Sequence, residues 1–198
     1  MRLYACAKSR LYINAAERAR FIVAAEKSSP VICAFCLTLL YTGCRISEAI
    51  SLLCASLQPE DRLITIRTLK RRNLYHIREL PVPEELMTRL VQRANQRADP
   101  AATLWANGAH PVDRITAYRW VKQVMAAAEI AGPQACPKGL RHGYGIHAIR
   151  SGVPLNMLSK WMGHASLSTT AIYTNAVGAE ELAIADRMWN EDGHANKV

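Results

Sequence analysis

Apolar positions recur along most of the chain at the spacing of helices, and one central stretch alternates like paired strands. Prolines, glycines and capping residues bound these segments and set their predicted ends. Two strand-like runs, 63–67 and 75–80, flank a basic turn at 70–73, which predicts a hairpin. A further short strand is expected at 104–105. Helices are expected over residues 15–25, 30–40, 47–53, 83–98, 111–131 and 140–151.

This pattern predicts a mainly α protein with a small antiparallel β-sheet, an α+β fold. The chain has 198 residues, of which half are hydrophobic, so it can bury a substantial core in one domain, or in one domain plus an extension. The extension is expected near the C-terminus. Residues 179–189 are amphipathic there, with one apolar face made by Leu182, Ala185 and Met188.

The segment from 154 to 173 predicts two helices joined by a glycine. Pro154 suits a first helical turn, and apolar residues follow at helical spacing, namely Leu155, Leu158 and Met162. Gly163 provides a left-handed end, and Ser166 can cap the next helix. Tyr173 lies about two turns into that second helix, which can return it toward His164. On this segment alone, a packed helix pair with a structural tyrosine is an equal alternative.

Charge and cysteine content narrow the class of protein. The net charge is +9 and the pI is about 9.5, which favours a polyanionic partner such as nucleic acid. No run of about 18 apolar residues is present, so no membrane span is expected, and the first eight residues lack the apolar core of a signal peptide. Six cysteines, with one CxxC at Cys33 and Cys36 and no second pair, indicate a reduced cytoplasm and no zinc site.

Candidate catalytic residues lie in four short motifs, or blocks, of the sequence. Arg45 follows a glycine turn in Thr-Gly-Cys-Arg-Ile-Ser-Glu, and Lys70 lies at the hairpin tip. Arg141 lies near a helix start in Lys-Gly-Leu-Arg-His, and His164 precedes Tyr173 by nine residues. In this order, from about residue 13 to 176, the blocks resemble the active site of the tyrosine recombinase, or phage integrase, family. Any single block would be weak support.

The resemblance implies a role for each of these residues. Tyr173 would attack a DNA phosphate and form a 3′-phosphotyrosyl bond, which frees a 5′-hydroxyl. Arg45 and Arg141 would clamp the non-bridging oxygens, since guanidinium forks match a phosphate that gains charge. Lys70 would protonate the leaving oxygen, and His164 would donate a hydrogen bond to the phosphate. The energy of the broken bond is stored in the phosphotyrosine, so neither a cofactor, a metal nor ATP is expected.

Other residues receive supporting roles from the same resemblance. Lys138 stands where the family usually has histidine and sometimes lysine, as an acid/base group or a phosphate contact. Arg71, Arg72 and Lys160 are expected to contact the DNA backbone, with Arg71 a weaker candidate for the Lys70 role. Glu48 is expected to support the helix of Arg45 rather than to take part in the chemistry.

Family members usually carry an N-terminal DNA-clamping domain, which is expected to be absent here. Residues 1–177 would then be a bare catalytic domain, and 178–198 a C-terminal amphipathic helix and tail. The resemblance implies a DNA recombination enzyme of a mobile genetic element, in the bacterial cytoplasm with the nucleoid. It would bind double-stranded DNA as a homotetramer and be monomeric when free. An accessory DNA-binding protein is a possible further partner.

Two other function classes are compatible with a basic chain of this kind. A DNA-binding accessory protein that does not cleave would not need the set of Tyr173, two arginines, His164 and Lys70. A type IB topoisomerase shares the chemistry, but the Gly163-His164 block and the short length favour a recombinase. The DNA site, and the choice among integration, excision, inversion and resolution, stay open.

Overall fold

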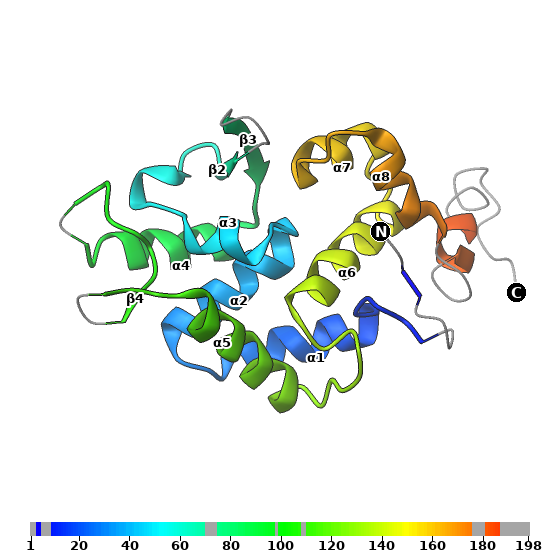
Figure 1. Ribbon diagram of the computed structural model, residues 1–198, viewed down its shortest axis with the longest axis horizontal. Coiled ribbons are helices and arrows are strands. Elements are labelled where there is room, and N and C mark those ends of the chain that lie inside the picture. Colours follow the sequence, from blue (N-terminus) through cyan, green and yellow to red (C-terminus); the bar gives the residue numbers. More distant parts are fainter. Residues whose placement is uncertain are drawn as a thin grey trace, which may run out of the picture.

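The computed structural model describes residues 3–4, 9–69, 75–97, 99–107, 110–175 and 181–186. Figure 1 shows a mainly helical molecule with a small sheet at its upper edge, and the strands of that sheet are antiparallel, so the predicted α+β class is confirmed. The helices are α1 (Ala15–Glu26), α2 (Pro30–Thr42), α3 (Ile46–Ile50), α4 (Glu84–Ala94), α5 (Arg114–Ala127), α6 (Pro137–Arg150), α7 (Leu155–Met162) and α8 (Leu167–Ala171). The strands are β1 (Leu57–Gln58), β2 (Leu63–Leu69), β3 (Tyr75–Pro81), β4 (Ala106–Asn107) and β5 (His110–Pro111). Short 3₁₀ helices are η1 (Cys54–Ser56) and η2 (Ile172–Asn175).

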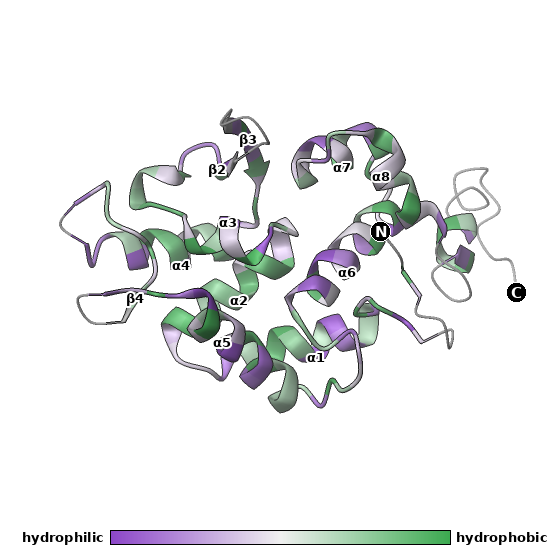
Figure 2. Cartoon of the chain, viewed as in Figure 1, coloured by the Kyte–Doolittle hydropathy of each residue, from purple (hydrophilic) through white to green (hydrophobic). Residues whose placement is uncertain are grey.

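Helix α2 is the centre of the main core. It is hydrophobic along nearly its whole length (Figure 2), as expected of a helix covered on all sides. It packs against α1, α4, α5 and α6. Phe35 at its middle makes edge-to-face contacts with Trp105 and Trp120, at centroid distances of 5.1 and 5.6 Å. The indole nitrogen of Trp105 donates to the carbonyl of Ala49 at 2.6 Å, which ties α3 to this core.

The sheet has the order β1-β2-β3, with both neighbouring pairs antiparallel. Ile64 pairs with Leu80, and Ile66 pairs with Arg78. Alternate residues face the core because strand side chains have a period of two, and Ile64, Ile66 and Leu80 are wholly buried. The predicted hairpin is confirmed, whereas the two-residue strand β1 was not predicted.

A second, smaller cluster joins α6 to α7 and η2. Its buried members include Ile146, Leu158, Met162 and Tyr173. Helix α6 contacts α2 on one side and α7 and η2 on the other, and it runs between the two groups of elements in Figure 1. Helix α6 therefore carries side chains that reach both clusters. Among the described helices, none is long and apolar enough to cross a membrane.

Several predicted boundaries were wrong for local reasons. The helix expected over 111–131 begins only at Arg114, because Pro111 pairs in β5 and Asp113 caps the helix by accepting from the Thr116 amide at 2.6 Å. The helix expected over 140–151 begins at Pro137, which occupies its first turn. The expected helices over 47–53 and 83–98 end at Ile50 and Ala94, and the strand expected at 104–105 lies at 106–107.

Tyr173 is also placed differently from the prediction. Ser166 does cap α8, by accepting from the Ser168 amide at 3.3 Å. The α-helix, however, ends after five residues, and Tyr173 lies on the tighter helix η2. Farther on, residues 181–186 are helical, with Leu182 exposed over 56% of its surface; the rest of the predicted 179–189 helix lies outside the described residues.

Candidate active site

Arg45 is presented by a glycine turn and held by a carboxylate. Gly43 ends α2 in the left-handed conformation, with φ of 59°, which glycine adopts without strain. Arg45 is the N-cap of α3. Its backbone amide and its Nη1 donate to Glu48, at 2.8 and 2.9 Å. The side chain of Arg45 is 45% exposed, so the guanidinium can still meet a ligand. Glu48 supports Arg45, as predicted.

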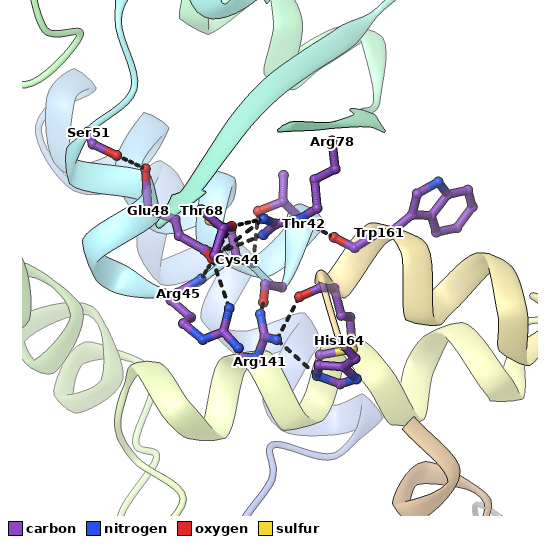
Figure 3. Close-up of polar contacts among 12 residues, drawn as sticks. Thr42, Cys44, Arg45, Glu48, Ser51, Thr68, Arg78, Arg141, Trp161 and His164 are labelled. Atoms are coloured by element: carbon purple, nitrogen blue, oxygen red, sulfur yellow. Dashed lines mark hydrogen bonds and ion pairs between the residues drawn. The ribbon is translucent and has the colours of Figure 1, made fainter. Parts of the chain in front are cut away.

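Glu48 is itself held by a buried arginine that the sequence analysis did not single out. Arg78 on β3 donates from Nη2 to Glu48 Oε2 at 2.7 Å, and Thr68 donates to Oε1 at 2.7 Å (Figure 3). Burial alone would raise the pKa of Glu48, but the hydrogen bonds and charge of Arg78 outweigh it, helped by the Arg45 amide. The pKa of Glu48 therefore falls to about 2, and the group stays a carboxylate.

Arg141 is buried on the first turns of α6 and binds the ends of two other helices. Its Nη1 donates to the Gly43 carbonyl at 2.6 Å, and its Nη2 donates to the Met162 carbonyl at 2.8 Å. Its Nε has no hydrogen-bond partner among the described residues. Burial lowers the pKa of Arg141, and the charge of Arg45 adds to this effect. Arg141 is thus a strong donor whose two carbonyl acceptors are uncharged.

His164 follows the left-handed end of α7 and is neutral in this arrangement. Gly163 has φ of 64°. The Nε2 of His164 lies 3.0 Å from Arg141 Nη2, and its Nδ1 lies 2.8 Å from Thr170 Oγ1. A guanidinium only donates, so Nε2 must accept, and Nδ1–H then donates to Thr170. Burial lowers the pKa of His164 to about 4, and the charges of Arg141 and Arg45 act in the same direction.

Tyr173 lies beside His164, but its hydroxyl points into the interior. The two rings are stacked at 15° with centroids 6.3 Å apart. The phenol is wholly buried, and its hydroxyl makes a long contact of 3.4 Å with Nδ1 of His142. The ring packs on α6 at Gly145, where an added Cβ would lie 2.6 Å from ring atoms. Burial raises the pKa of Tyr173 to about 12, despite the nearby charges of Arg141 and Arg45.

A cavity of about 750 Å³ opens between the α3–sheet side and the α7–α8 side. Arg45, His76, His164 and Thr169 are among its lining residues. Arg45 reaches the cavity from one side and His164 from the other, while Tyr173 lies behind His164 in the smaller core cluster. No group of three or more histidine, cysteine or acidic side chains within the described residues is arranged to hold a metal ion.

The remaining predicted residues divide into two sets. Lys138 lies exposed on the first turn of α6, and Lys160 lies exposed on α7. Lys70, Arg71 and Arg72 lie outside the described residues. The hairpin strands on either side of them line the cavity through Arg67, Thr68 and His76.

Three contributors to the site were missed or undervalued at the sequence level: Arg78, Thr170 and His142. His142 received no role from the sequence, but its Nδ1 contacts the Tyr173 hydroxyl. Its adjacency to Arg141 was the available signal. Arg78 had no signal, because a single arginine in an alternating strand normally faces solvent.

The buried neutral histidines predict a loss of stability in acid. Burial lowers the pKa of His142 to about 4, as it does for His164, from 6.5 in the unfolded chain. The folded pKa is the lower one, so between these values the unfolded state binds more protons and becomes favoured. Each histidine lowers the free energy of unfolding by at most about 1.4 kcal/mol per pH unit as the pH falls through this window.

Urea denaturation across the same pH range measures this slope. His164→Gln should make the slope shallower, because it removes one of the three described histidines whose pKa burial lowers to about 4, the others being His142 and His147. His110→Gln, at an exposed position, serves as the matched control and should keep the full slope. An unchanged slope in His164→Gln would contradict the assignment of a neutral His164.

Comparison with known proteins agrees with this geometry. The model of the phage integrase family matches residues 12–179. A tyrosine recombinase of Thermosipho africanus is 29% identical over 150 residues, which is 76% of this chain and 51% of the relative. Tyrosine recombinase XerA of Pyrococcus furiosus is 30% identical over 141 residues, which is 69% and 47% of the two chains. The chain thus spans about half the length of these relatives.

Solved structures share the fold. A XerA recombinase structure aligns with a TM-score of 0.75 at 22% identity, covering 94% of this chain and 66% of the other. A XerH site-specific recombinase bound to its difH substrate aligns with a TM-score of 0.71 at 19% identity, covering 94% and 59%. The family match over residues 12–179, most of the chain, identifies this chain as a member of the phage integrase family.

Proposed function

We propose that this chain is the catalytic part of a tyrosine-type site-specific recombinase, which cleaves and rejoins DNA strands through a 3′-phosphotyrosyl intermediate. One observation carries the proposal. Arg45 and His164 line one cavity, Arg141 lies within hydrogen-bond distance of His164, and the ring of Tyr173 stacks beside that histidine. A protein that only bound DNA would not need a tyrosine next to a histidine and two arginines.

The chemistry assigns one task to each group. A scissile phosphate in the cavity would be held by Arg45, and by Arg141 in exchange for its present carbonyl acceptors. The Tyr173 hydroxyl would lose its proton to solvent water, and its oxygen would form a bond to phosphorus as the bond from phosphorus to the 5′-oxygen breaks. Lys70 would give its proton to that 5′-oxygen. Two guanidinium groups stabilise the charge that develops on the phosphate oxygens, typically the largest contribution to such a reaction.

The buried phenol indicates that the free protein is not yet competent. With its pKa raised to about 12, Tyr173 is a neutral phenol whose hydroxyl faces His142. We infer that DNA binding draws Tyr173 away from His142 and toward the phosphate, where the two arginines favour the phenolate. His164 Nε2 accepts from Arg141 in the free protein. It would donate to the phosphate only after Arg141 has turned to the DNA and the ring has gained or moved a proton.

Double-stranded DNA is the proposed partner. The net charge of +9 suits a polyanion, and Arg71, Arg72, Lys138 and Lys160 are proposed phosphate contacts. Related solved structures include a Tn1549 transposon integrase in complex with transposon right end DNA. We propose residues 1–177 as the catalytic domain and 178–198 as a C-terminal segment. Assembly as a tetramer on DNA from free monomers, with an accessory DNA-binding protein, is part of the same proposal.

Covalent trapping tests the function directly. Nicked duplexes taken from the DNA flanking the encoding gene should yield a protein–DNA adduct that is stable in denaturant and carries the protein on the 3′ end. The adduct should form without ATP and in the presence of a chelator. Plasmid lacking the trapped site should stay supercoiled, and its relaxation would instead favour a topoisomerase.

The proton donor to the leaving group is predicted to be Lys70. A 5′-bridging phosphorothiolate substrate has a sulfur leaving group that needs no proton. Lys70→Ala should therefore cleave this substrate nearly as fast as the unmodified protein does, although it fails on ordinary DNA. Arg141→Ala should remain slow on both substrates, since it lacks a phosphate contact. If the phosphorothiolate substrate rescues cleavage by Lys138→Ala but not by Lys70→Ala, then Lys138 and not Lys70 is the proton donor.

A further inference from the structure

Arg78 is a fully buried cation that connects three elements of the fold. It lies on β3, and its side chain is 1% exposed. Its Nη2 donates to Glu48 Oε2 on α3 at 2.7 Å, its Nη1 donates to Thr68 on β2, and its Nε donates to the Trp161 carbonyl on α7 at 2.8 Å. Figure 3 shows the Trp161 side chain pointing away, so the contact is with the backbone alone.

Each end of this network leads to a residue proposed to hold the phosphate. Glu48 receives the amide and Nη1 of Arg45 on the same two oxygens that it offers to Arg78. On the other side, Trp161 lies in the last turn of α7, just before Gly163 and His164. Arg78 is therefore the direct bridge between the Glu48–Arg45 pair and the turn that carries His164.

Gly163 shows how closely Arg78 approaches that turn. A Cβ built on Gly163 would lie 3.0 Å from the Arg78 guanidinium carbon and from its Nη1. Glycine is thus favoured at 163 both by its φ of 64° and by the guanidinium packed against it. Arg78 therefore packs directly against the turn that carries His164.

Stability alone does not account for this arrangement. A buried ion pair can often be replaced by apolar side chains without loss of stability, because removing two charges from water is costly. A planar guanidinium offers something that an apolar group lacks, namely donors at fixed angles toward several acceptors at once. Arg78 uses these donors on α3, β2 and α7, the elements on the two sides of the cavity.

We propose that Arg78 is a positioning residue that sets the separation between Arg45 and the Gly163–His164 turn, so that both reach the same phosphate. The inference rests on the proposed recombinase function. Arg78 is too deeply buried to touch DNA itself. It acts through Glu48 on Arg45 and through the Trp161 carbonyl on His164.

Arg78→Lys tests the proposal with the charge retained. An ammonium can still pair with Glu48, but it cannot also hold the Trp161 carbonyl in the guanidinium plane. The variant is expected to fold and to bind the trapped duplex with unchanged Kd. Its cleavage rate at saturating protein should fall by about 10- to 100-fold, the cost of a misplacement on the order of 1 Å. Arg89→Lys is the matched control, since Arg89 pairs with Glu26 at an exposed site, and it should cleave normally.

A double-mutant cycle separates positioning from general weakening. In an Arg45→Ala background, Arg78→Lys should lower the cleavage rate by a much smaller factor than in the native chain, because one of the two groups that Arg78 positions is gone. An equal fold-loss of cleavage rate in both backgrounds, or a normal cleavage rate in Arg78→Lys, would overturn the proposal. If Arg78→Lys does not fold, Glu48→Gln combined with Arg78→Met leaves no buried charge unpaired. The same loss of rate at unchanged Kd is then expected from that double variant.

A measurement without DNA keeps this inference distinct from the recombinase function. Histidine NMR should show His164 titrating near its lowered pKa of about 4 in the native chain. In Arg78→Lys the turn loosens, and the pKa of His164 should move back toward 6.5. An unshifted His164 pKa would overturn the positioning role. Failure of the native chain to form any covalent adduct would instead overturn the proposed function.

Discussion

Tyr173→Phe is expected to abolish covalent attachment to DNA while leaving folding and DNA binding intact. The change removes only a hydroxyl, whose contact in the free protein is a long one of 3.4 Å to His142. The ring itself, packed on Gly145 and stacked beside His164, remains. Loss of one such hydrogen bond costs at most about 1 kcal/mol, whereas loss of the nucleophile removes the reaction.

The measurement is a denaturing gel of the protein trapped on a nicked duplex, together with a binding assay on the same DNA. Tyr12→Phe is a suitable control, because Tyr12 is also a buried tyrosine in the smaller cluster, and its hydroxyl contacts Tyr4 at 3.2 Å. That variant should form the adduct at the normal rate. A covalent band that persists in Tyr173→Phe would show that another residue attacks the phosphate.

Arg45→Ala and Arg141→Ala are each expected to slow cleavage by at least about 100-fold, the usual loss for one contact to a developing oxyanion. The two variants should differ in stability. Arg45 is half-exposed, and among the described residues its side chain pairs with Glu48 alone, so its loss is mild for the fold. Arg141 is buried, and its removal leaves the Gly43 and Met162 carbonyls without their donor, which costs about 1–3 kcal/mol for each unsatisfied group.

Single-turnover rates at saturating protein separate catalysis from binding in these variants. Arg89→Ala is the matched control for Arg45→Ala, since both arginines pair with a glutamate and their side chains are 42% and 45% exposed. Arg45→Lys should also be slow, because an ammonium cannot form two parallel hydrogen bonds to a phosphate. Near-normal cleavage by either alanine variant would remove that arginine from the proposed phosphate clamp.

Local signals in the sequence were sufficient to predict the helix ends and turns that present the candidate site residues. The apolar run ending in Gly43 predicted a buried helix and a glycine turn before Arg45, and both are present. Gly163 and Ser166 likewise end α7 and cap α8. Such signals are reliable because capping and positive φ depend on one or two adjacent residues. The order of the motifs was enough to indicate the family, since each short block keeps its chemistry whatever lies between.

Only the tertiary structure decided how these blocks are joined. Arg78 is 30 residues from Glu48 and 83 from Trp161, and periodicity along a strand says which residues share a face but not which distant group they meet. The same applies to Tyr173, whose burial against His142 and Gly145 depends on how α6 packs against η2. The sequence by itself therefore determined which residues form the candidate site and the local turns that present them. The burial of Tyr173, the neutral state of His164 and the bridge through Arg78 depend on packing between residues that are far apart in the sequence. There the three-dimensional arrangement of the elements decides which groups become hydrogen-bond partners.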